Sequence, residues 1–310
     1  MDVETRGPGM RLRYIGLGVP NVDEVVAFFL DDWELEDAGA NTDAALLRAP
    51  GSEDEFILRV RAASSSQVDM FGFGVDNASE VDELHRCLRA ADATIVGEPA
   101  SILHEGGGYG FRFFDPDGHL LEVASDSPRQ QTRTGDFAPG QPLLLSHFVI
   151  NATQTDRLVD WYCAHLGFRV TDRLEDKLIF LTTTDAHHQI AIATSTENGL
   201  NHIAYECHDV DSFMRAAGRL QRRGHHLLWG PGRHGPGDNT FAYFRDPAGF
   251  VQEFTTGLES VGSPDWKVRS WRSLPEESDL WGTSNPRPND EFVGRRDPGL
   301  GVVPDWIRSS

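Results

Sequence analysis

Residues 199–257 carry the pattern that decides the fold, and they read GLNHIAYECHDVDSFMRAAGRLQRRGHHLLWGPGRHGPGDNTFAYFRDPAGFVQEFTTG. The pattern predicts a strand, a helix, a second strand, a loop, a third strand, a turn and a fourth strand. His202 lies in the apolar run near the start of this stretch, and Glu253 lies in the apolar run at its end. A charged group buried in a core must be paired or bound to a cation, so we expect a paired charge or a bound cation at both positions.

The apolar run LLLSHFVI at residues 143–150 contains a third polar residue of this kind, His147. A lone histidine on a strand is more often a hydrogen-bonded core residue than a metal ligand. Two histidines and one carboxylate on separate strands, however, can form the facial triad of non-haem Fe(II) sites, which leaves coordination positions open. We therefore predict that His147, His202 and Glu253 together bind one metal ion.

The composition is that of a globular protein and excludes some partners. The 310 residues are enough for two domains of ordinary size. A net charge of -20 argues against nucleic acid or an anionic membrane as a partner, because phosphate binding needs clustered Lys and Arg. We expect neither a signal peptide nor a membrane span, because residues 1–16 contain no apolar h-region and no run approaches about 18 apolar residues. Cys87, Cys163 and Cys207 have no CxxC spacing, so we expect reduced thiols in a cytoplasmic protein.

The first half of the chain is repeated in the second half. The segment FRFFDPDGHLLEV at residues 111–123 matches AYFRDPAGFVQEF at residues 242–254, and an offset of 131 residues relates the DP dipeptides of the two. We predict an α+β fold of paired βαβββ modules. In this fold residues 10–126 and residues 143–257 form two domains, each an incomplete β-barrel with helices outside. A polar segment that contains Pro and Gly links them.

The two halves differ at the residues predicted to bind the metal. The repeat matches His147 with Tyr14, places His202 near Phe73, and matches Glu253 with Glu122. The first half therefore lacks both histidines, and we expect one metal per chain, in the second domain. Glu122 is either a relic of a ligand or a solvated or salt-bridged glutamate, and the second interpretation is favoured.

The segments SHFVI, NHIAYE and GRHG…Y…DPAG…QEF resemble those of the two-domain extradiol ring-cleavage dioxygenases of the vicinal oxygen chelate superfamily. The resemblance covers about residues 10–257 and is sharpest over residues 143–257. In that family the metal ligands are His, His and Glu of the C-terminal domain, and the matching positions are His147, His202 and Glu253. The same resemblance implies three catalytic residues: His188, His234 and Tyr243.

The resemblance also implies a reaction. A catechol-type aromatic ring would be cleaved beside its diol with O2 at an Fe(II) site, with Mn(II) possible in its place, to give a product of the muconic semialdehyde type. Such chemistry belongs to aromatic-compound catabolism. His188 would act as the acid/base, and Tyr243 and His234 would hydrogen-bond the deprotonated substrate oxygen. The family resemblance further suggests a homo-oligomer.

Other functions on the same fold stay open. One is a metal-dependent isomerase or lyase of the glyoxalase kind, whose sites usually use four protein ligands drawn from two modules. Another is a metal-free protein that binds a drug and confers resistance. The three-ligand set and the residues His188, His234 and Tyr243 argue against both.

Past residue 257 the repeat ends. Residues 258–310 contain four tryptophans, too many for a disordered segment, so we expect this tail to pack over the second, catalytic domain. Arg295 and Arg296 could neutralise an acidic substituent of the substrate, although a surface pair is favoured. His208, His225 and His226 are expected to face solvent.

Overall fold

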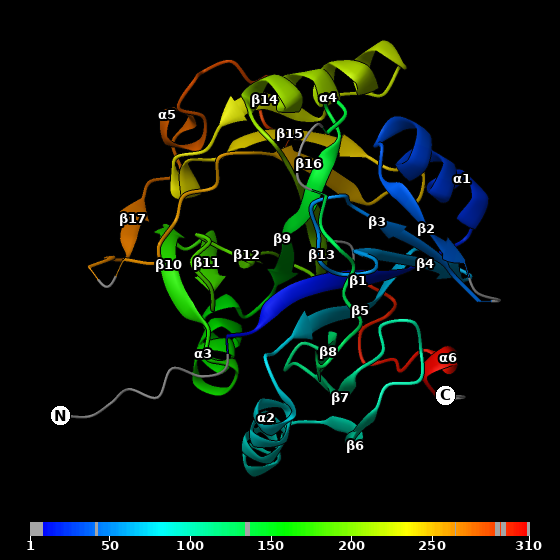
Figure 1. Ribbon diagram of the computed structural model, residues 1–310. Coiled ribbons are helices and arrows are strands. Elements are labelled where there is room, and N and C mark those ends of the chain that lie inside the picture. The colour runs from blue at the N-terminus through cyan, green and yellow to red at the C-terminus, as the bar shows by residue number, and fades with distance from the viewer. Residues whose placement is uncertain are drawn as a thin grey trace.

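The structure is a computed structural model that describes residues 9–40, 43–133, 137–263, 265–288, 292 and 296–308. It contains four βαβββ modules followed by a tail (Figure 1). The first domain contains β1 (Arg11–Val19), α1 (Val22–Ala27), β2 (Glu36–Ala40), β3 (Ala45–Arg48), β4 (Leu58–Ala62), β5 (Gln67–Gly74), α2 (Ala78–Ala90), β6 (Ile95–Ser101), β7 (Tyr109–Phe114) and β8 (Leu120–Ser125). The second contains β9 (Pro142–Ala152), α3 (Thr155–Leu166), β10 (Arg169–Leu174), β11 (Leu178–Thr182), β12 (Ile190–Thr194), β13 (Gly199–Cys207), α4 (Val210–Arg222), β14 (Trp229–Arg233), β15 (Thr240–Arg245) and β16 (Val251–Thr255).

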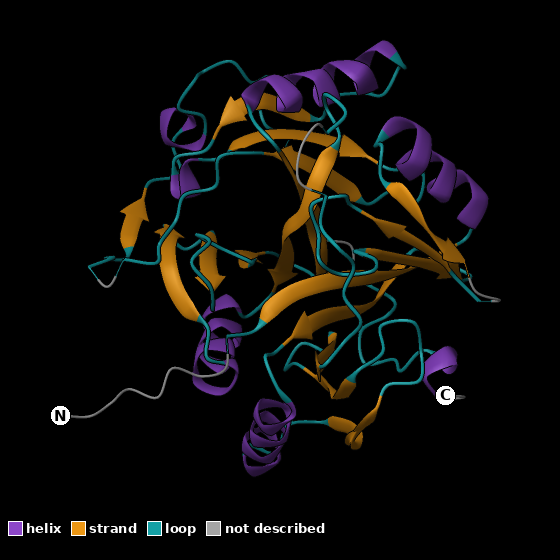
Figure 2. Ribbon diagram, viewed as in Figure 1, coloured by secondary structure: helices purple, strands orange, loops and turns teal. Residues whose placement is uncertain are grey.

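Each domain is one curved sheet with its helices on the outside (Figure 2). The strand order is β2-β3-β4-β1-β5-β8-β7-β6 in the first sheet and β14-β15-β16-β13-β9-β12-β11-β10 in the second, where a tail strand then joins β10. The two modules of each domain meet at an antiparallel central pair, β1 with β5 and β9 with β13. Within the described residues the end strands of a sheet do not pair with each other, so both barrels are open, and the predicted fold class is confirmed.

The helices form where the sequence supplies a cap and an apolar face. Asn77 precedes α2, and its side chain accepts a hydrogen bond from the backbone N–H of Glu80. Val81, Leu84 and Leu88 then recur at helical spacing and are buried against the sheet.

Aromatic side chains pack the two domains together. Phe71 of the first sheet stacks on Phe148 of the second with ring centroids 4.0 Å apart. Trp33, just after the short π-helix η1 (Phe28–Asp32), stacks on Phe254 at 3.7 Å. Aromatic pairs contribute roughly 0.5–1.5 kcal/mol each beyond the area they bury. The core is therefore continuous across the domain boundary.

The tail closes the open side of the second barrel and then crosses to the first domain. It contains β17 (Arg269–Trp271), α5 (Pro275–Ser278) and α6 (Asp305–Arg308). Strand β17 pairs with β10 at one sheet edge, and the backbone N–H of Leu280 donates to Arg233 O of β14 at the other (2.7 Å). Trp306 then lies over the guanidinium of Arg59 in the first domain, at 3.8 Å. The sequence did not predict this contact between the tail and the first domain.

None of the helices in the described part of the chain is long and apolar enough to cross a membrane. Cys87, Cys163 and Cys207 are all free.

Candidate metal centre

Three neighbouring strands of the second sheet bring the predicted ligands together. His147 lies on β9, His202 on β13 and Glu253 on β16, and the sheet order places β13 between the other two. His147 and Glu253 are both paired with Ala204, from opposite sides. His202 lies two residues before Ala204 and so projects from the same strand face as Ala204. The strand register alone therefore directs the three side chains to one place on the same face of the sheet.

The ligand atoms of these residues lie within 4.8 Å of one another. The carboxylate Oε2 of Glu253 is 3.0 Å from Nε2 of His202 and 3.3 Å from Nε2 of His147. Burial alone would raise the pKa of Glu253, but the two imidazoles lower it to about 2. The carboxylate is fully buried, and neither of its oxygens has an aligned hydrogen-bond donor among the residues described.

A buried carboxylate without donors is costly unless a cation compensates it. Two imidazole nitrogens and a carboxylate oxygen are ligands that first-row divalent metals accept. The donor set and the orphaned oxygens of Glu253 therefore fit a divalent metal ion, and they fit it with only three protein ligands.

Hydrogen bonds on the far side of each imidazole orient it toward Glu253. Nδ1 of His202 lies 2.7 Å from the side-chain carbonyl of Asn201, which can only accept, so this nitrogen carries the proton and Nε2 keeps its lone pair. The amide of Asn201 donates in turn to Asn151 and to the backbone carbonyl of Phe292 in the tail. Nδ1 of His147 lies 3.0 Å from the hydroxyl of Ser146.

The three further residues predicted for the site surround the ligands. The ring of His188 lies 4.1 Å from that of His147, and the ring of Tyr243 lies 5.1 Å from that of His202, measured between centroids. The hydroxyl of Tyr243 lies 3.0 Å from Nε2 of His234. The structure thus brings all six predicted residues into one place in the second domain.

Burial sets the protonation of these residues. Nδ1 of His234 faces the backbone carbonyl of Ser278 at 3.1 Å and so carries a proton, which leaves Nε2 to accept from the Tyr243 hydroxyl. Burial lowers the pKa of His234 to about 4 and raises that of Tyr243 well above its usual value. Burial, followed by the nearby histidines, holds the pKa of His188 well below its usual range. At neutral pH these side chains are therefore uncharged.

Sequence reasoning missed Arg287. Its guanidinium lies 5.2 Å from the ring centre of Trp229 and 5.0 Å from that of Phe292, and both rings contact Tyr243. Arg287 is accessible to solvent, yet crowding by protein atoms lowers its pKa. The tail has no counterpart in the first half, so no sequence pattern pointed to it. Arg295 lies outside the described residues, and Arg296 is exposed.

The first domain fills the matching positions with ordinary polar contacts. Tyr14 and Glu122 flank Gly72 as His147 and Glu253 flank Ala204, which agrees with the sequence pairing. The counterpart of His202 is Met70, however, since Met70 pairs with Gly16 as His202 pairs with Val149; the expected position near Phe73 is corrected by this register. The carboxylate of Glu122 accepts from three side chains: Tyr14 (2.8 Å), His104 (2.7 Å) and Arg112 (3.0 Å).

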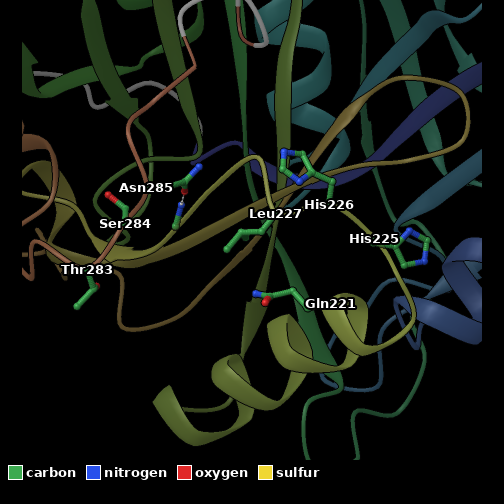
Figure 3. Close-up of a pocket in the computed structure, with 8 residues that line it drawn as sticks. Gln221, His225, His226, Leu227, Thr283, Ser284 and Asn285 are labelled. Carbon is green, nitrogen blue, oxygen red and sulfur yellow. Dashed lines mark hydrogen bonds between the residues drawn. The ribbon is translucent and has the colours of Figure 1, made fainter.

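A recess of about 650 Å³ lies on the outer side of the second domain, between the end of α4, β14 and the tail (Figure 3). None of the six predicted site residues lines it. His226 is exposed there, as expected, and His208 is exposed elsewhere. His225 differs from expectation, because it is half-buried and its Nε2 lies 2.8 Å from Asp32 of the first domain. Asn285 joins the tail to this edge by accepting from the backbone N–H of Gly230.

Comparison with known proteins places the chain among families that share this fold. A model of the Glyoxalase/Bleomycin resistance protein/Dioxygenase superfamily matches residues 11–123 and 144–254. Metapyrocatechase 2 of Cupriavidus necator is 30% identical over 194 residues, 56% of this chain and 59% of that protein. Manganese-dependent 2,3-dihydroxybiphenyl 1,2-dioxygenase of Geobacillus genomosp. 3 is 25% identical, over 86% of this chain and 92% of that protein.

Solved structures give the same picture. A Mn(II)-bound glyoxalase from Novosphingobium aromaticivorans superposes with a TM-score of 0.91 and 36% identity, over 96% of this chain and 99% of the other. Homoprotocatechuate 2,3-dioxygenase of Arthrobacter globiformis superposes with a TM-score of 0.85 at 21% identity, over 94% of each chain, and shares the fold.

Proposed function

The chain belongs to the Glyoxalase/Bleomycin resistance protein/Dioxygenase superfamily, and we propose that within it the protein is an extradiol dioxygenase that cleaves a catechol-type ring with O2. The observation that carries the proposal is the group His147, His202 and Glu253, with both oxygens of Glu253 buried and lacking aligned donors among the described residues. The product would be of the muconic semialdehyde type. The names of the curated relatives, a metapyrocatechase and a dihydroxybiphenyl dioxygenase, support the reaction class.

The metal would be held by Nε2 of His147, Nε2 of His202 and the carboxylate of Glu253. A bound Fe(II) would supply Lewis acidity that lowers the pKa of a catechol hydroxyl, and a redox centre shared by the ring and O2. Three protein ligands leave room for both substrates. Holding two reactants in one place lowers the entropic part of the activation barrier of their reaction.

The neighbouring side chains would handle the protons. His188 is buried and neutral, so it can take a proton from the substrate and return it later in the reaction. Tyr243 lies against His202, and its hydroxyl donates to His234, so the phenol oxygen is placed to accept a hydrogen bond from a substrate hydroxyl beside the metal. Phe292 and Trp229 pack around Tyr243 and exclude water from that side.

The identity of the metal is part of the proposal. Fe(II) suits a site of two histidines and a carboxylate with open positions. Mn(II) accepts the same ligands, and it appears in the names of two similar proteins. We propose Fe(II), with Mn(II) as the alternative.

A second candidate function is a glyoxalase-like isomerase or lyase. The Novosphingobium protein carries the glyoxalase name at 36% identity, which favours this candidate. Against it, the metal-binding group found among the described residues has three members rather than four. That group also lies on strands of the second domain alone.

One measurement distinguishes the two candidate functions. The protein would be loaded anaerobically with Fe(II), or in parallel with Mn(II), and oxygen uptake would be recorded on adding a panel of catechols. Uptake of one O2 per catechol with a new visible absorption band would support the dioxygenase. Metal bound at one per chain with no uptake on any catechol would reject it in favour of the isomerase, and a protein that binds no metal would reject both.

A further inference from the structure

His188 stands at the end of a row of buried polar groups. Its Nδ1 lies 2.9 Å from Nδ1 of His187, and Nε2 of His187 lies 3.1 Å from Oδ2 of Asp172 on β10. Asp172 and His187 are fully buried, and His188 is 3% exposed. The proposed reaction assigns a task to His188 alone and leaves the two groups behind it unexplained.

Tail residues fix Asp172 as a carboxylate. Arg269 donates to it from the backbone and the guanidinium, and the indole N–H of Trp271 donates at 2.8 Å. Despite burial, which would raise it, the pKa of Asp172 is lowered by His187, Arg269 and Trp271. A carboxylate with these donors is negatively charged and can only accept.

The charge of Asp172 decides where the proton of His187 lies. The N–H vector of His187 is not aligned on Oδ2, so this contact is an electrostatic attraction rather than a linear hydrogen bond. A lone pair on Nε2 would be repelled by the carboxylate 3.1 Å away, whereas an N–H is attracted. Nε2 of His187 therefore carries a proton, and in the neutral form of the ring Nδ1 is left as an acceptor.

The acceptor on His187 in turn decides the tautomer of His188. Two nitrogens 2.9 Å apart need one proton between them, and the neutral ring of His187 cannot supply it, so with His187 in this form Nδ1 of His188 is the donor. The lone pair of neutral His188 is then on Nε2. This nitrogen has no hydrogen-bond partner among the described residues, while the ring of His188 lies against the ligand His147.

We propose that Asp172 and His187 are positioning residues that hold His188 in its Nδ1–H tautomer, so that Nε2 meets the substrate as a proton acceptor. The role in turnover rests on the proposed dioxygenase function. In the proton-transfer step the O–H bond of a catechol hydroxyl breaks, an Nε2–H bond forms, and a catecholate and an imidazolium result. The positive charge of that imidazolium faces Asp172 through His187, as an aspartate supports a catalytic histidine in other enzymes.

The tautomer can be measured without turnover. Protein labelled with ¹⁵N in histidine would be studied by long-range ¹H–¹⁵N correlation, metal-free and loaded with Zn(II), and the His188 signals would be assigned by their loss in His188→Phe. The expected pattern is Nδ1–H in both forms. An Nε2–H pattern in the unaltered protein would overturn the proposal.

Variants of His187 test the cause. His187→Leu removes the acceptor and should shift His188 toward Nε2–H, whereas His187→Gln keeps a carbonyl acceptor and should preserve Nδ1–H. As a matched control, His225→Leu removes a half-buried histidine paired with Asp32 and should leave the His188 signals unchanged. An Nδ1–H pattern that persists in His187→Leu would show that His187 does not set it.

Activity adds a second readout. In the Fe(II) enzyme, His187→Leu should lower kcat by about 10- to 100-fold, the usual effect of losing a residue that orients a site, with KM little changed and His187→Gln less affected. If no catechol is cleaved by any form, the proposed function fails while the tautomer measurement still decides the proposal about Asp172 and His187. If catechols are cleaved and kcat is unchanged in His187→Leu, the positioning role fails alone.

Discussion

The two domains carry a glutamate at the same place in the same sheet and surround it in opposite ways. Glu122 and Glu253 are both fully buried, and each has a pKa of about 2. Glu122 accepts hydrogen bonds from Tyr14, His104 and Arg112. Glu253 faces two imidazole nitrogens instead and has no aligned donor among the described residues. One fold position thus holds a buried charge by protein donors in the first domain and, at the proposed site of the second, by an external cation.

The openings of the two barrels differ in a similar way. In the first domain Arg59 lies under Trp306 of the tail and pairs with Glu105 at 3.3 Å. In the second domain Arg287 of the tail lies over Trp229, and no carboxylate pairs with it within the described parts of the chain. Among the described residues, the first opening is filled by the chain itself, whereas the second presents an arginine without a carboxylate partner beside the site.

The largest expected effect is loss of metal when either kind of ligand is removed from the second domain. His202→Ala and Glu253→Ala should each reduce bound metal to near zero, because the two remaining protein ligands cannot hold the ion. Metal content per chain after anaerobic loading and gel filtration would be measured by mass spectrometry. Glu122→Gln is the matched control and should keep one metal per chain; an equal loss there, or stoichiometric metal in Glu253→Ala, would contradict the assignment.

Next in size is the effect of removing the proposed acid/base. His188→Phe should keep the metal and catechol binding but lower turnover by roughly 10²- to 10⁴-fold, the usual contribution of a positioned acid or base. Oxygen uptake and catechol binding would be measured on the same preparation. An unchanged turnover number would remove His188 from the reaction.

The polar cluster of the first domain should contribute stability rather than activity. Since the pKa of Glu122 falls from 4.5 to about 2 on folding, its ionised form stabilises the fold above pH 4.5, and this contribution is lost as the pH falls from 4.5 toward 2. By linkage the full contribution is on the order of 3 kcal/mol. Urea unfolding of Glu122→Gln and the unaltered protein should differ by about this amount at pH 7, by less than half of it at pH 3, and converge only as the pH falls to 2 and below. A constant difference across that range would contradict the linkage.

Much of the fold and the predicted site was readable from the sequence because strand periodicity and the internal repeat are local patterns. The repeat placed Tyr14 against His147 and Glu122 against Glu253 correctly. It placed His202 near Phe73 and missed Met70, although Met70 and His202 lie 132 residues apart, as do the caps Asn77 and Asp209 of α2 and α4.

The parts that escaped prediction depend on contacts between distant segments. Arg287 reaches the site only because Leu280 and Asn285 fasten the tail to β14, and neither residue belongs to the repeat. Asp172 meets His187 through the pairing of β10 with β11 and β17, and sequence spacing does not reveal that pairing. The tail has no counterpart in the first half of the chain, so its tertiary contacts could not be predicted from local sequence patterns.

The smallest effect concerns the choice of substrate. Arg287 offers a planar set of donors with no anion partner among the described residues, and aromatic rings flank it near Tyr243. Guanidinium groups bind carboxylates through two parallel hydrogen bonds. A catechol with a carboxylate substituent should therefore be preferred over its neutral amide, and Arg287→Met should reduce that preference by about tenfold in kcat/KM, which is roughly 1.4 kcal/mol.

The preference is a ratio measured on one enzyme preparation, so partial loading with metal cancels from it. Arg272→Gln provides the control, because Arg272 is also a tail arginine but already donates to Glu277 at 2.6 Å on the surface. Its ratio should match that of the unaltered protein. If Arg287→Met and Arg272→Gln changed the ratio equally, the effect would come from net charge over the whole tail, and the two barrel openings would not differ in the way their arginines indicate.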